Sequence, residues 1–167
     1  CLDAKQGAER WRADFSTRYG TPLPELGFVC SPLVIEDGVY VQVADSFVRV
    51  DKRTGKSDWR TLVRREKGQG AMGQGAYSSP DFGVLHGQPQ LLVANIDAIS
   101  GIHPTTGRVL WKRTLDSYKQ GCILAPIVYR DGVLTSTRAS RTGFYPVMRR
   151  SDQFTITDGW KNKLVVY

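Results

Sequence analysis

The sequence predicts an all-β fold assembled from a repeated unit of about four short antiparallel strands. Three observations predict it: evenly spaced tryptophans, a shared turn segment before them, and runs of strand-forming residues separated by turn pairs. Of the 167 residues, 41% are hydrophobic and 10% aromatic, which is enough apolar material for a packed core. No helical periodicity of useful length interrupts the strand pattern.

All four tryptophans of the chain lie at a nearly constant interval. Trp11, Trp59, Trp111 and Trp160 are separated by 48, 52 and 49 residues. A long internal repeat is the sequence signature of solenoids and propellers. The spacing therefore predicts about three consecutive copies of one structural unit.

A common segment leads into the first three tryptophans, over residues 2–11, 50–59 and 102–111. Its form is an apolar residue, Asp or His, two variable residues, Thr or Gln, Gly, three variable residues and Trp. We expect the acidic residue to cap a tight turn through side-chain hydrogen bonds and the glycine to take a positive φ. The residues with these structural roles are Asp3, Asp51, Gly7, Gly55 and Gly107.

The copy before Trp160 has diverged. It keeps Asp152 eight residues before the tryptophan and Thr155 five residues before it, but Ile156 stands where the glycine is expected. We therefore expect a longer loop or no tight turn in this copy.

A second landmark precedes the strands of each later copy. Ser31-Pro32, Ser79-Pro80 and Ala125-Pro126 stand in a similar register, and a turn pair follows each of them. The turn pairs are Asp37-Gly38, His86-Gly87 and Asp131-Gly132, and the strand-like runs cover residues 33–35, 39–43, 47–50, 90–94 and 127–129. Asp-Gly between such runs is a strong hairpin signal, so each unit is expected to hold four strands.

Four strands in about 50 residues is the size of one β-propeller blade. We expect residues 1–15 to end one blade, 31–62 and 79–115 to form two blades, 125–160 to form a diverged blade, and 161–167 to begin the next. A repeated tryptophan suits this design, because one large ring per blade fills the seam between neighbours. The four tryptophans are therefore interpreted as packing residues rather than ligand-stacking residues.

The combination of Ser-Pro, Asp-Gly and the segment ending in Trp resembles the repeat of pyrroloquinoline-quinone-like propellers. That family includes quinoprotein alcohol dehydrogenases and an assembly lipoprotein of the bacterial outer membrane. The resemblance covers nearly the whole chain and implies a ring of seven or eight blades. At about 50 residues a blade, the chain supplies about three of them, so we expect a fragment of a larger propeller.

The three cysteines, Cys1, Cys30 and Cys122, have neither disulfide-scaffold nor zinc-ligand spacing. Cys1 invites the interpretation of a lipid-modified N-terminus, but the repeat alignment places it within a blade. Exposed terminal strands also lead us to expect that the isolated chain is unstable or associates.

The resemblance implies what a dehydrogenase of the family would need: calcium held by acidic and amide side chains, a catalytic Asp and often adjacent cysteines above the quinone. None of these can be placed here, because Asp3, Asp51 and Asp152 belong to the turn motif. No catalytic residue, metal site or cofactor is expected. Pyrroloquinoline quinone and calcium are expected only if the chain belongs to a dehydrogenase.

Two other features of the sequence bear on a possible binding site. A glycine-rich segment, interpreted as an inter-blade loop, is the candidate for a ligand-facing loop; its glycines are Gly68, Gly70, Gly73 and Gly75. It lacks the strand and helix context of a phosphate-binding loop. His86 and His103 are expected to be surface or turn residues, and residues 135–141 a polar loop facing solvent.

The predicted function is a non-catalytic propeller scaffold for protein or ligand interaction in a secreted or envelope protein of bacteria. Its partners would be another protein or the remaining blades of the same chain. Two alternatives stay open: a fragment of a quinoprotein dehydrogenase, and a polysaccharide-binding module. The net charge of +7 is spread along the chain without a nucleic-acid motif, and no run of residues is apolar enough to span a membrane.

Overall fold

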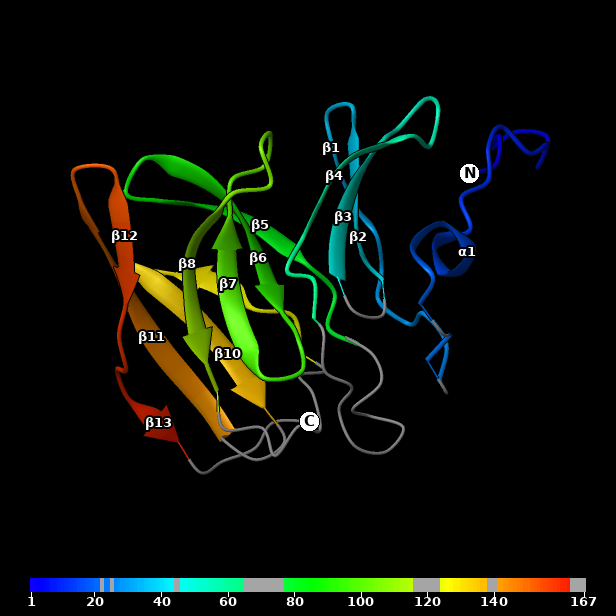
Figure 1. Ribbon diagram of the computed structural model, residues 1–167. Helices are drawn as coiled ribbons and strands as arrows, with labels where there is room; N and C mark the ends of the chain where they lie inside the picture. The colour runs from blue at the N-terminus through cyan, green and yellow to red at the C-terminus, as the bar shows by residue number, and fades with distance from the viewer. Residues whose placement is uncertain are drawn as a thin grey trace.

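The computed structural model describes residues 1–21, 23–24, 26–43, 46–64, 77–115, 124–137 and 141–162. Three antiparallel sheets account for most of this part of the chain (Figure 1). They follow one another in sequence and are called here the first, second and third sheet. The predicted all-β architecture is confirmed.

The first sheet contains β1 (Leu33–Ile35), β2 (Gly38–Val43), β3 (Ser46–Asp51) and β4 (Ser57–Thr61), hydrogen-bonded in that order. Its strands are rich in valine and aromatic residues, which suit a pleated surface buried on both faces. The register of β3 on β4 shifts between Arg49 and Val50, directly before the acidic residue of the repeat. This bulge leads the chain into the turn that ends at Gly55.

The second sheet repeats this plan with β5 (Asp81–Leu85), β6 (Gln88–Ala94), β7 (Ala98–Ile102) and β8 (Val109–Thr114). Every residue of β7 is buried, as expected of an inner strand covered on both faces. The register shifts again one residue before the repeat position of the acidic residue, between Gly101 and Ile102. The two sheets thus share the bulge as well as the strand order.

The third sheet contains β9 (Ile127–Tyr129), β10 (Gly132–Thr137), β11 (Arg141–Arg150), β12 (Gln153–Ile156) and β13 (Lys161–Asn162). Both β12 and β13 pair with the long strand β11, one after the other along its length. They therefore act together as the fourth strand of this sheet.

The diverged copy of the repeat folds differently from what its sequence predicts. Ser151 and Asp152 form a two-residue turn between β11 and β12, where Arg150 pairs with Gln153. A tight turn is therefore present, and the expectation of a longer loop was wrong. The turn has only two residues because β11 and β12 stay paired up to Arg150 and Gln153; β11 has 10 residues, against 6 in β3 and 5 in β7. Residues 161–162 pair with β11 in the third sheet, whereas we expected residue 161 to begin a further blade.

Two of the predicted turn pairs are displaced by one residue. The turn between β1 and β2 consists of Glu36 and Asp37, and the corresponding turn of the third sheet consists of Arg130 and Asp131. Glu36 and Arg130 have φ of 51° and 52°, while Gly38 begins β2. In the second sheet the turn is His86-Gly87, as predicted. The register of the strand pair, not the presence of glycine, decides which two residues turn.

The hydrophobic core lies between the sheets. Tyr40 and Phe47 of the first sheet pack against Leu91, Val93 and Ile102 of the second. A second cluster joins the second and third sheets, and its buried members are Leu85, Leu92, Ala94, Ile99, Trp111, Leu115, Val133, Tyr145 and Val147. These two clusters are shared between sheets, so each sheet depends on a neighbour for burial of one of its apolar faces.

A single helical turn, α1 (Phe15–Tyr19), covers the other face of the first sheet. Asp14 caps it by accepting a hydrogen bond from the backbone N–H of Thr17 at 3.0 Å, and Gly20 ends it with φ of 62°. Sequence periodicity missed this helix because five residues are too few to show a period of 3.6. The pairing of an Asp cap with a Gly stop was the available signal.

Candidate functional site

The repeat turns gather at one end of the sheets (Figure 1). In the turn of the first sheet, Oδ1 of Asp51 accepts hydrogen bonds from the backbone N–H groups of Arg53 and Thr54 and from the Thr54 hydroxyl, at 2.7–3.0 Å. Gly55 closes the turn with φ of 69° and donates its N–H to the Asp51 carbonyl. The side chain therefore satisfies the donors that a tight turn leaves unpaired.

The same turn is built at the N-terminal copy and, with a different residue, in the second sheet. Oδ1 of Asp3 accepts the N–H groups of Lys5 and Gln6, at 3.0 and 3.1 Å. His103 takes the acidic position in the second sheet, and its Nδ1 accepts the N–H of Thr105 at 3.2 Å. An imidazole nitrogen thus replaces a carboxylate oxygen as the acceptor.

These hydrogen bonds shift the titration of the two carboxyl groups. The Arg10 guanidinium and then the turn N–H groups lower the pKa of Asp3. The hydroxyl of Thr54, followed by its backbone N–H, lowers the pKa of Asp51. Both effects stabilise the ionised form, because every group involved donates to the carboxylate.

Each of the first two tryptophans contacts the repeat turn that follows it. Nε1 of Trp11 donates to the carbonyl of Lys52 at 2.8 Å, and Nε1 of Trp59 donates to the carbonyl of Pro104 at 3.2 Å. Both acceptors stand one residue after the acidic position of the turn. The indole therefore links one copy to a fixed backbone atom of the next.

The glycine of each of these two turns lies under the indole ring. A Cβ added to Gly55 would lie 2.5 Å from Cε3 of Trp11, and one added to Gly107 would lie 2.7 Å from Cδ2 of Trp59. Glycine is therefore required twice over, for its positive φ and for the close approach of the ring. We call this contact, ring on glycine and N–H on carbonyl, the Trp–turn contact.

The two later tryptophans lie in different surroundings. Trp111 is buried and donates its Nε1–H to Oε1 of Gln90, within the second sheet, at 2.6 Å. Trp160 precedes β13, is 50% exposed, and stacks on Phe144 with ring centroids 6.2 Å apart. The Trp–turn contact is thus made by Trp11 and Trp59.

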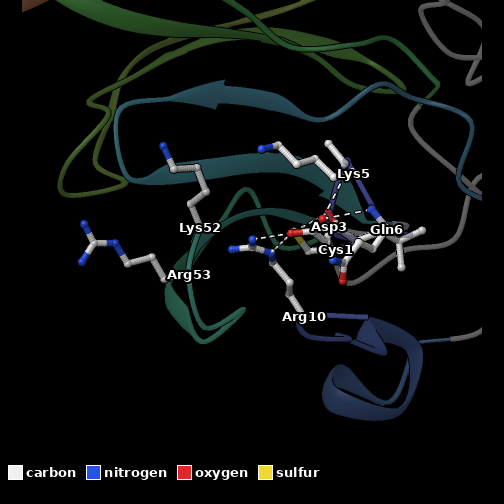
Figure 2. Close-up of a pocket in the computed structure, with 9 residues that line it drawn as sticks. Cys1, Asp3, Lys5, Gln6, Arg10, Lys52 and Arg53 are labelled. Atoms are coloured by element: carbon white, nitrogen blue, oxygen red, sulfur yellow. Dashed lines mark hydrogen bonds and ion pairs between the residues drawn. The ribbon is translucent and has the colours of Figure 1, made fainter. Parts of the chain in front are cut away.

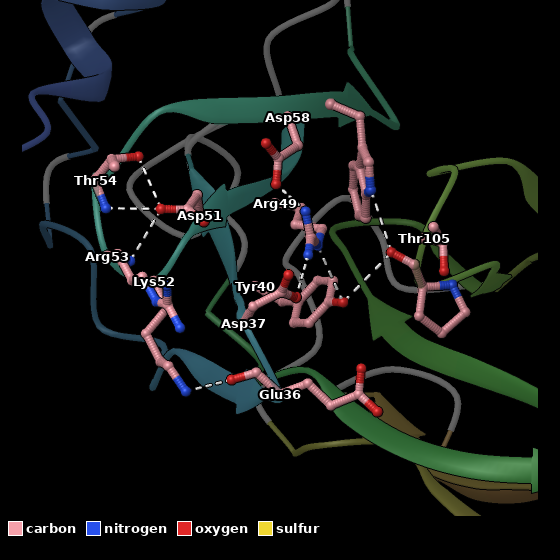
Figure 3. Close-up of polar contacts among 12 residues, drawn as sticks. Glu36, Asp37, Tyr40, Arg49, Asp51, Lys52, Arg53, Thr54, Asp58 and Thr105 are labelled. Carbon is pink, nitrogen blue, oxygen red and sulfur yellow. Dashed lines mark hydrogen bonds and ion pairs between the residues drawn. The ribbon is translucent and has the colours of Figure 1, made fainter.

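A polar network around Arg49 reinforces the contact between the first and second sheets (Figure 3). The guanidinium forms ion pairs with Asp37 and Asp58 and donates its Nε–H to the Tyr40 hydroxyl at 3.3 Å. That hydroxyl in turn donates to the Pro104 carbonyl at 3.4 Å, the same oxygen that Trp59 binds. The network therefore runs from the surface of the first sheet to the turn of the second.

The Ser-Pro landmarks hold the sheets together at the opposite end of the strands. The backbone N–H of Ser31 donates to Oγ of Ser79 at 2.9 Å, and the Ser78 hydroxyl donates to the Leu124 carbonyl at 2.8 Å. Buried Gln42 donates through Nε2 to the carbonyls of Ser78 and Ala94, at 2.5 and 3.0 Å. Hydrogen bonds at equivalent positions of the repeat therefore connect each sheet to the next.

The seam between the second and third sheets uses other residues. Nε2 of His86 lies 2.6 Å from the carbonyl oxygen of Val147, and Arg149 donates to the His86 carbonyl at 3.1 Å. Arg113 forms an ion pair with Asp158 at 2.5 Å. His86 is therefore a turn residue, as predicted, and its ring also bridges two sheets.

An open hollow of about 970 Å³ lies beside the N-terminal turn (Figure 2). Its charged lining is mostly cationic, and the lining residues are Cys1, Leu2, Asp3, Ala4, Lys5, Gln6, Arg10, Lys52 and Arg53. Arg10 is held by Asp3 at 2.5 Å. The shape is too open and its cations too exposed to select one small ligand by desolvation.

The glycines Gly68, Gly70, Gly73 and Gly75 lie outside the described residues, as does Cys122. The polar stretch from residue 135 was expected to face solvent, but Thr135 and Ser136 lie in β10 and are buried. That expectation was wrong because these residues belong to an inner strand, which pairs with β9 on one side and with β11 on the other.

The family of the chain follows from its sequence match. Residues 1–164 match the family described as outer membrane protein assembly factor BamB. The chain belongs to this family. The resemblance to pyrroloquinoline-quinone-like propellers is thereby confirmed, and the three sheets are blades of a β-propeller.

Two solved structures share the fold. The crystal structure of BamB from Moraxella catarrhalis superposes with a TM-score of 0.57 at 18% identity, covering 86% of this chain and 38% of that one. A europium-containing methanol dehydrogenase gives a TM-score of 0.50 at 18% identity, covering 69% of this chain and 22% of that one. The chain thus spans well under half of either structure. No protein with curated annotation matches it.

Proposed function

We propose that the chain is part of a non-catalytic propeller scaffold that holds protein partners during outer-membrane protein assembly. The observation that carries the proposal is the match to the BamB family over residues 1–164. A non-catalytic role also agrees with the contacts of the repeat's polar side chains, which stabilise turns and the contacts between sheets. Asp3 and Asp51 cap turns, while Asp37 and Asp58 both bind Arg49.

The sheets offer a physical means of binding such partners. In the described part of the chain, β1 and β4 lie at the edges of the first sheet, and β5 and β8 lie at the edges of the second. Edge strands present backbone N–H and C=O groups that an extended peptide can pair with. Segments of outer-membrane β-barrel proteins are extended and alternate apolar with polar residues, so they have the required form.

Binding of an alternating peptide tests the scaffold function. A labelled ten-residue peptide of alternating apolar and polar residues is titrated with the protein and followed by fluorescence anisotropy. The matched control has the same length and sequence except that two central residues are proline, which removes backbone donors. Saturable binding of the first peptide and loss of binding by the second are expected; equal binding of both, or of neither, contradicts strand pairing.

A second candidate function is that of a quinoprotein dehydrogenase fragment, favoured by the structural likeness to a methanol dehydrogenase. The described residues do not fit its metal site: they contain no group of three His, Cys, Asp or Glu side chains placed to hold an ion. This function would therefore require residues beyond those described. Reduction of a dye by methanol in the presence of pyrroloquinoline quinone and calcium would favour it, and binding on a glycan array would favour a polysaccharide-binding module instead.

We further propose that the protein acts outside the cytoplasm, in the bacterial envelope, as the family description suggests. In the described ranges, no helix has the length and apolar character needed to cross a membrane. Fractionation of cells that express the protein from its native gene tests this location. Recovery with a periplasmic or outer-membrane marker is expected, and recovery with a cytoplasmic marker contradicts it.

A further inference from the structure

Exposed cations stand at the end of the sheets where the repeat turns gather, called here the turn end (Figure 1). They lie in or next to the turns of the N-terminal copy and of all three sheets, and they are Lys5, Lys52, Arg53, Lys56, Arg108 and Arg150. Among the described residues, no carboxylate lies within ion-pair distance of any of them. Lys52 donates to the backbone carbonyl of Glu36, which leaves its charge without a counterion. These cations are therefore available to an anionic partner.

Most carboxylates of the turn end are engaged within the fold. Those held in ion pairs or in turn hydrogen bonds are Asp3, Asp37, Asp51, Asp58 and Asp152. Glu36 and Asp131 are exposed and offset part of the cationic charge. Within the described part of the chain, the surface of this end thus presents more free cations than free carboxylates.

The exposure of the turn end does not depend on how many sheets flank it. Neighbouring sheets cover one another's faces, because their shared apolar clusters lie between them. The Asp51–Gly55 turn already has a repeat turn on each side, to which Trp11 and Trp59 connect it. Its cations nevertheless remain exposed. Additional blades would therefore leave the cations of such a turn in solvent.

The cations are densest around the hollow beside the N-terminal turn (Figure 2). Lys5, Lys52 and Arg53 line it, together with Arg10, which is paired with Asp3. No aromatic ring is among its lining residues, so it lacks the stacking platform on which proteins bind single-stranded nucleic acid. A hollow this open suits several anionic groups presented side by side, as the headgroups of anionic phospholipids are.

We propose that the turn end docks on an anionic phospholipid surface, with the cations of the Asp51–Gly55 turn and of the N-terminal turn next to the lipid phosphates. Each Lys or Arg close to such a surface strengthens binding by a modest factor, and several of them acting together hold the protein there. The inference goes beyond the proposed scaffold function and rests on the proposed envelope location only for the presence of a membrane. Peptide binding by the sheet edges is measured without lipid, so either proposal can fail alone.

Co-sedimentation with vesicles tests the proposal. The protein is mixed with vesicles of phosphatidylcholine alone, or of phosphatidylcholine and phosphatidylglycerol in equal parts. At about 0.1 M salt we expect it to sediment with the anionic vesicles and to stay in solution with the neutral ones. At about 1 M salt the binding should be lost, because the screening length falls to about 3 Å.

A matched pair of double variants separates a local surface from net charge. Arg53→Gln combined with Lys56→Gln should lower the partition coefficient on anionic vesicles about twenty-fivefold, which is about fivefold for each cation. The control combines Lys112→Gln with Lys161→Gln, at exposed cations on β8 and β13 away from the turn end, and changes the net charge equally. It should change the partition coefficient by less than about threefold. Thermal unfolding without vesicles checks that both double variants keep the stability of the unmodified protein.

Four results would overturn the proposal. The first is an unmodified protein that stays in solution with the anionic vesicles at low salt, and the second is equal binding to neutral and anionic vesicles. The third is an equal loss of binding in the two double variants, which would assign the effect to net charge alone. The fourth is tighter binding to a single-stranded DNA oligonucleotide than to the anionic vesicles, which would assign the surface to nucleic acid.

Discussion

Asp51 shows how a single carboxylate stabilises the turn of the repeat. Its Oδ1 accepts three hydrogen bonds from Arg53 and Thr54, and these donors hold the pKa of the carboxyl group below its ordinary value. The folded protein therefore binds a proton at Asp51 less readily than the unfolded chain does. The stabilisation is present above the ordinary pKa of about 3.9 and is lost as the pH falls through the lower folded value.

Replacing Asp51 by Asn should make the stability of the protein less dependent on pH. We expect Asp51→Asn to lower the urea midpoint at pH 7, because the amide lacks the charge that strengthens the three hydrogen bonds. The difference from the unmodified protein should shrink as the pH falls from about 5 toward 2. Urea unfolding across this range checks it, with Asp81→Asn as control; a gap that stays constant with pH would contradict the explanation.

His103 holds the acidic position of the second turn with one weaker acceptor. His103→Asp should raise the free energy of unfolding at pH 7 by about 0.5–1 kcal/mol, because a carboxylate can accept from two turn N–H groups with charge assistance. Thermal unfolding at pH 7 measures this gain, and a loss of stability would show that the imidazole makes further contacts.

Cys1 and Cys30 differ in accessibility. Cys1 is exposed, whereas Cys30 is 8% exposed and its thiol donates to the Gln42 carbonyl at 3.4 Å. Burial raises the pKa of the Cys30 thiol, which reduces its thiolate content as well as its access to reagents. Site-resolved mass spectrometry after brief iodoacetamide treatment should find Cys1 alkylated first and Cys30 alkylated only on addition of denaturant.

At the level of elements, the Trp–turn contact ties the repeat turns of the first and second sheets to the preceding copy of the repeat. Gly107 illustrates it, because its positive φ shapes the turn and its missing side chain admits the ring of Trp59. The carbonyl of Pro104 then receives both the Trp59 indole and the Tyr40 hydroxyl. A substitution in this turn should therefore also destabilise the neighbouring sheet.

Two glycines with similar backbone angles separate strain from packing. Gly87 has φ of 75° and open space at its Cβ position, whereas Gly107 has φ of 70° and faces Trp59. Gly87→Ala should cost about 1 kcal/mol through strain alone. Gly107→Ala should cost about 3 kcal/mol, because the ring must also move. Equal costs in urea unfolding would mean that the indole does not need the glycine.

For the whole molecule, stability depends on contacts between sheets. Phe47 is fully buried and lies in the cluster that joins the first sheet to the second. The sheets are therefore expected to unfold together rather than one at a time. This coupling suits a scaffold, because it holds successive edges in fixed relative positions.

Removing Phe47 should weaken the second sheet as well as the first. We expect Phe47→Ala to lower the free energy of unfolding by about 3–5 kcal/mol. Hydrogen exchange should lose protection in β6 and β7 as well as in β2 and β3. The control is Val34→Ala at a side chain that is 54% exposed, where the change should stay within about 0.5 kcal/mol. Loss of protection confined to the first sheet would contradict the coupling.

Much of the fold was predictable from the sequence because its signals are local. The Trp spacing and the Asp-to-Gly segment define a turn and the strands beside it, and strand runs such as 33–35 and 127–129 match β1 and β9. The turn glycines Gly7, Gly55 and Gly107 all have φ between 67° and 70°. These properties depend on hydrogen bonds and torsion angles within a few residues, so the local sequence carries them.

The remaining features depend on contacts between residues that are far apart in the chain. Trp59 reaches the Pro104 carbonyl, Gln42 reaches Ser78, and β11 extends until it pairs with both β12 and β13. The role of Trp160 is likewise decided by the face on which its ring lies. By itself the sequence determined the repeat, its three turns that end at Gly7, Gly55 and Gly107, and its family, because these arise from short-range chemistry. Only the tertiary structure decided which tryptophan meets which turn and which strand residues are buried between sheets, because those depend on how whole sheets pack.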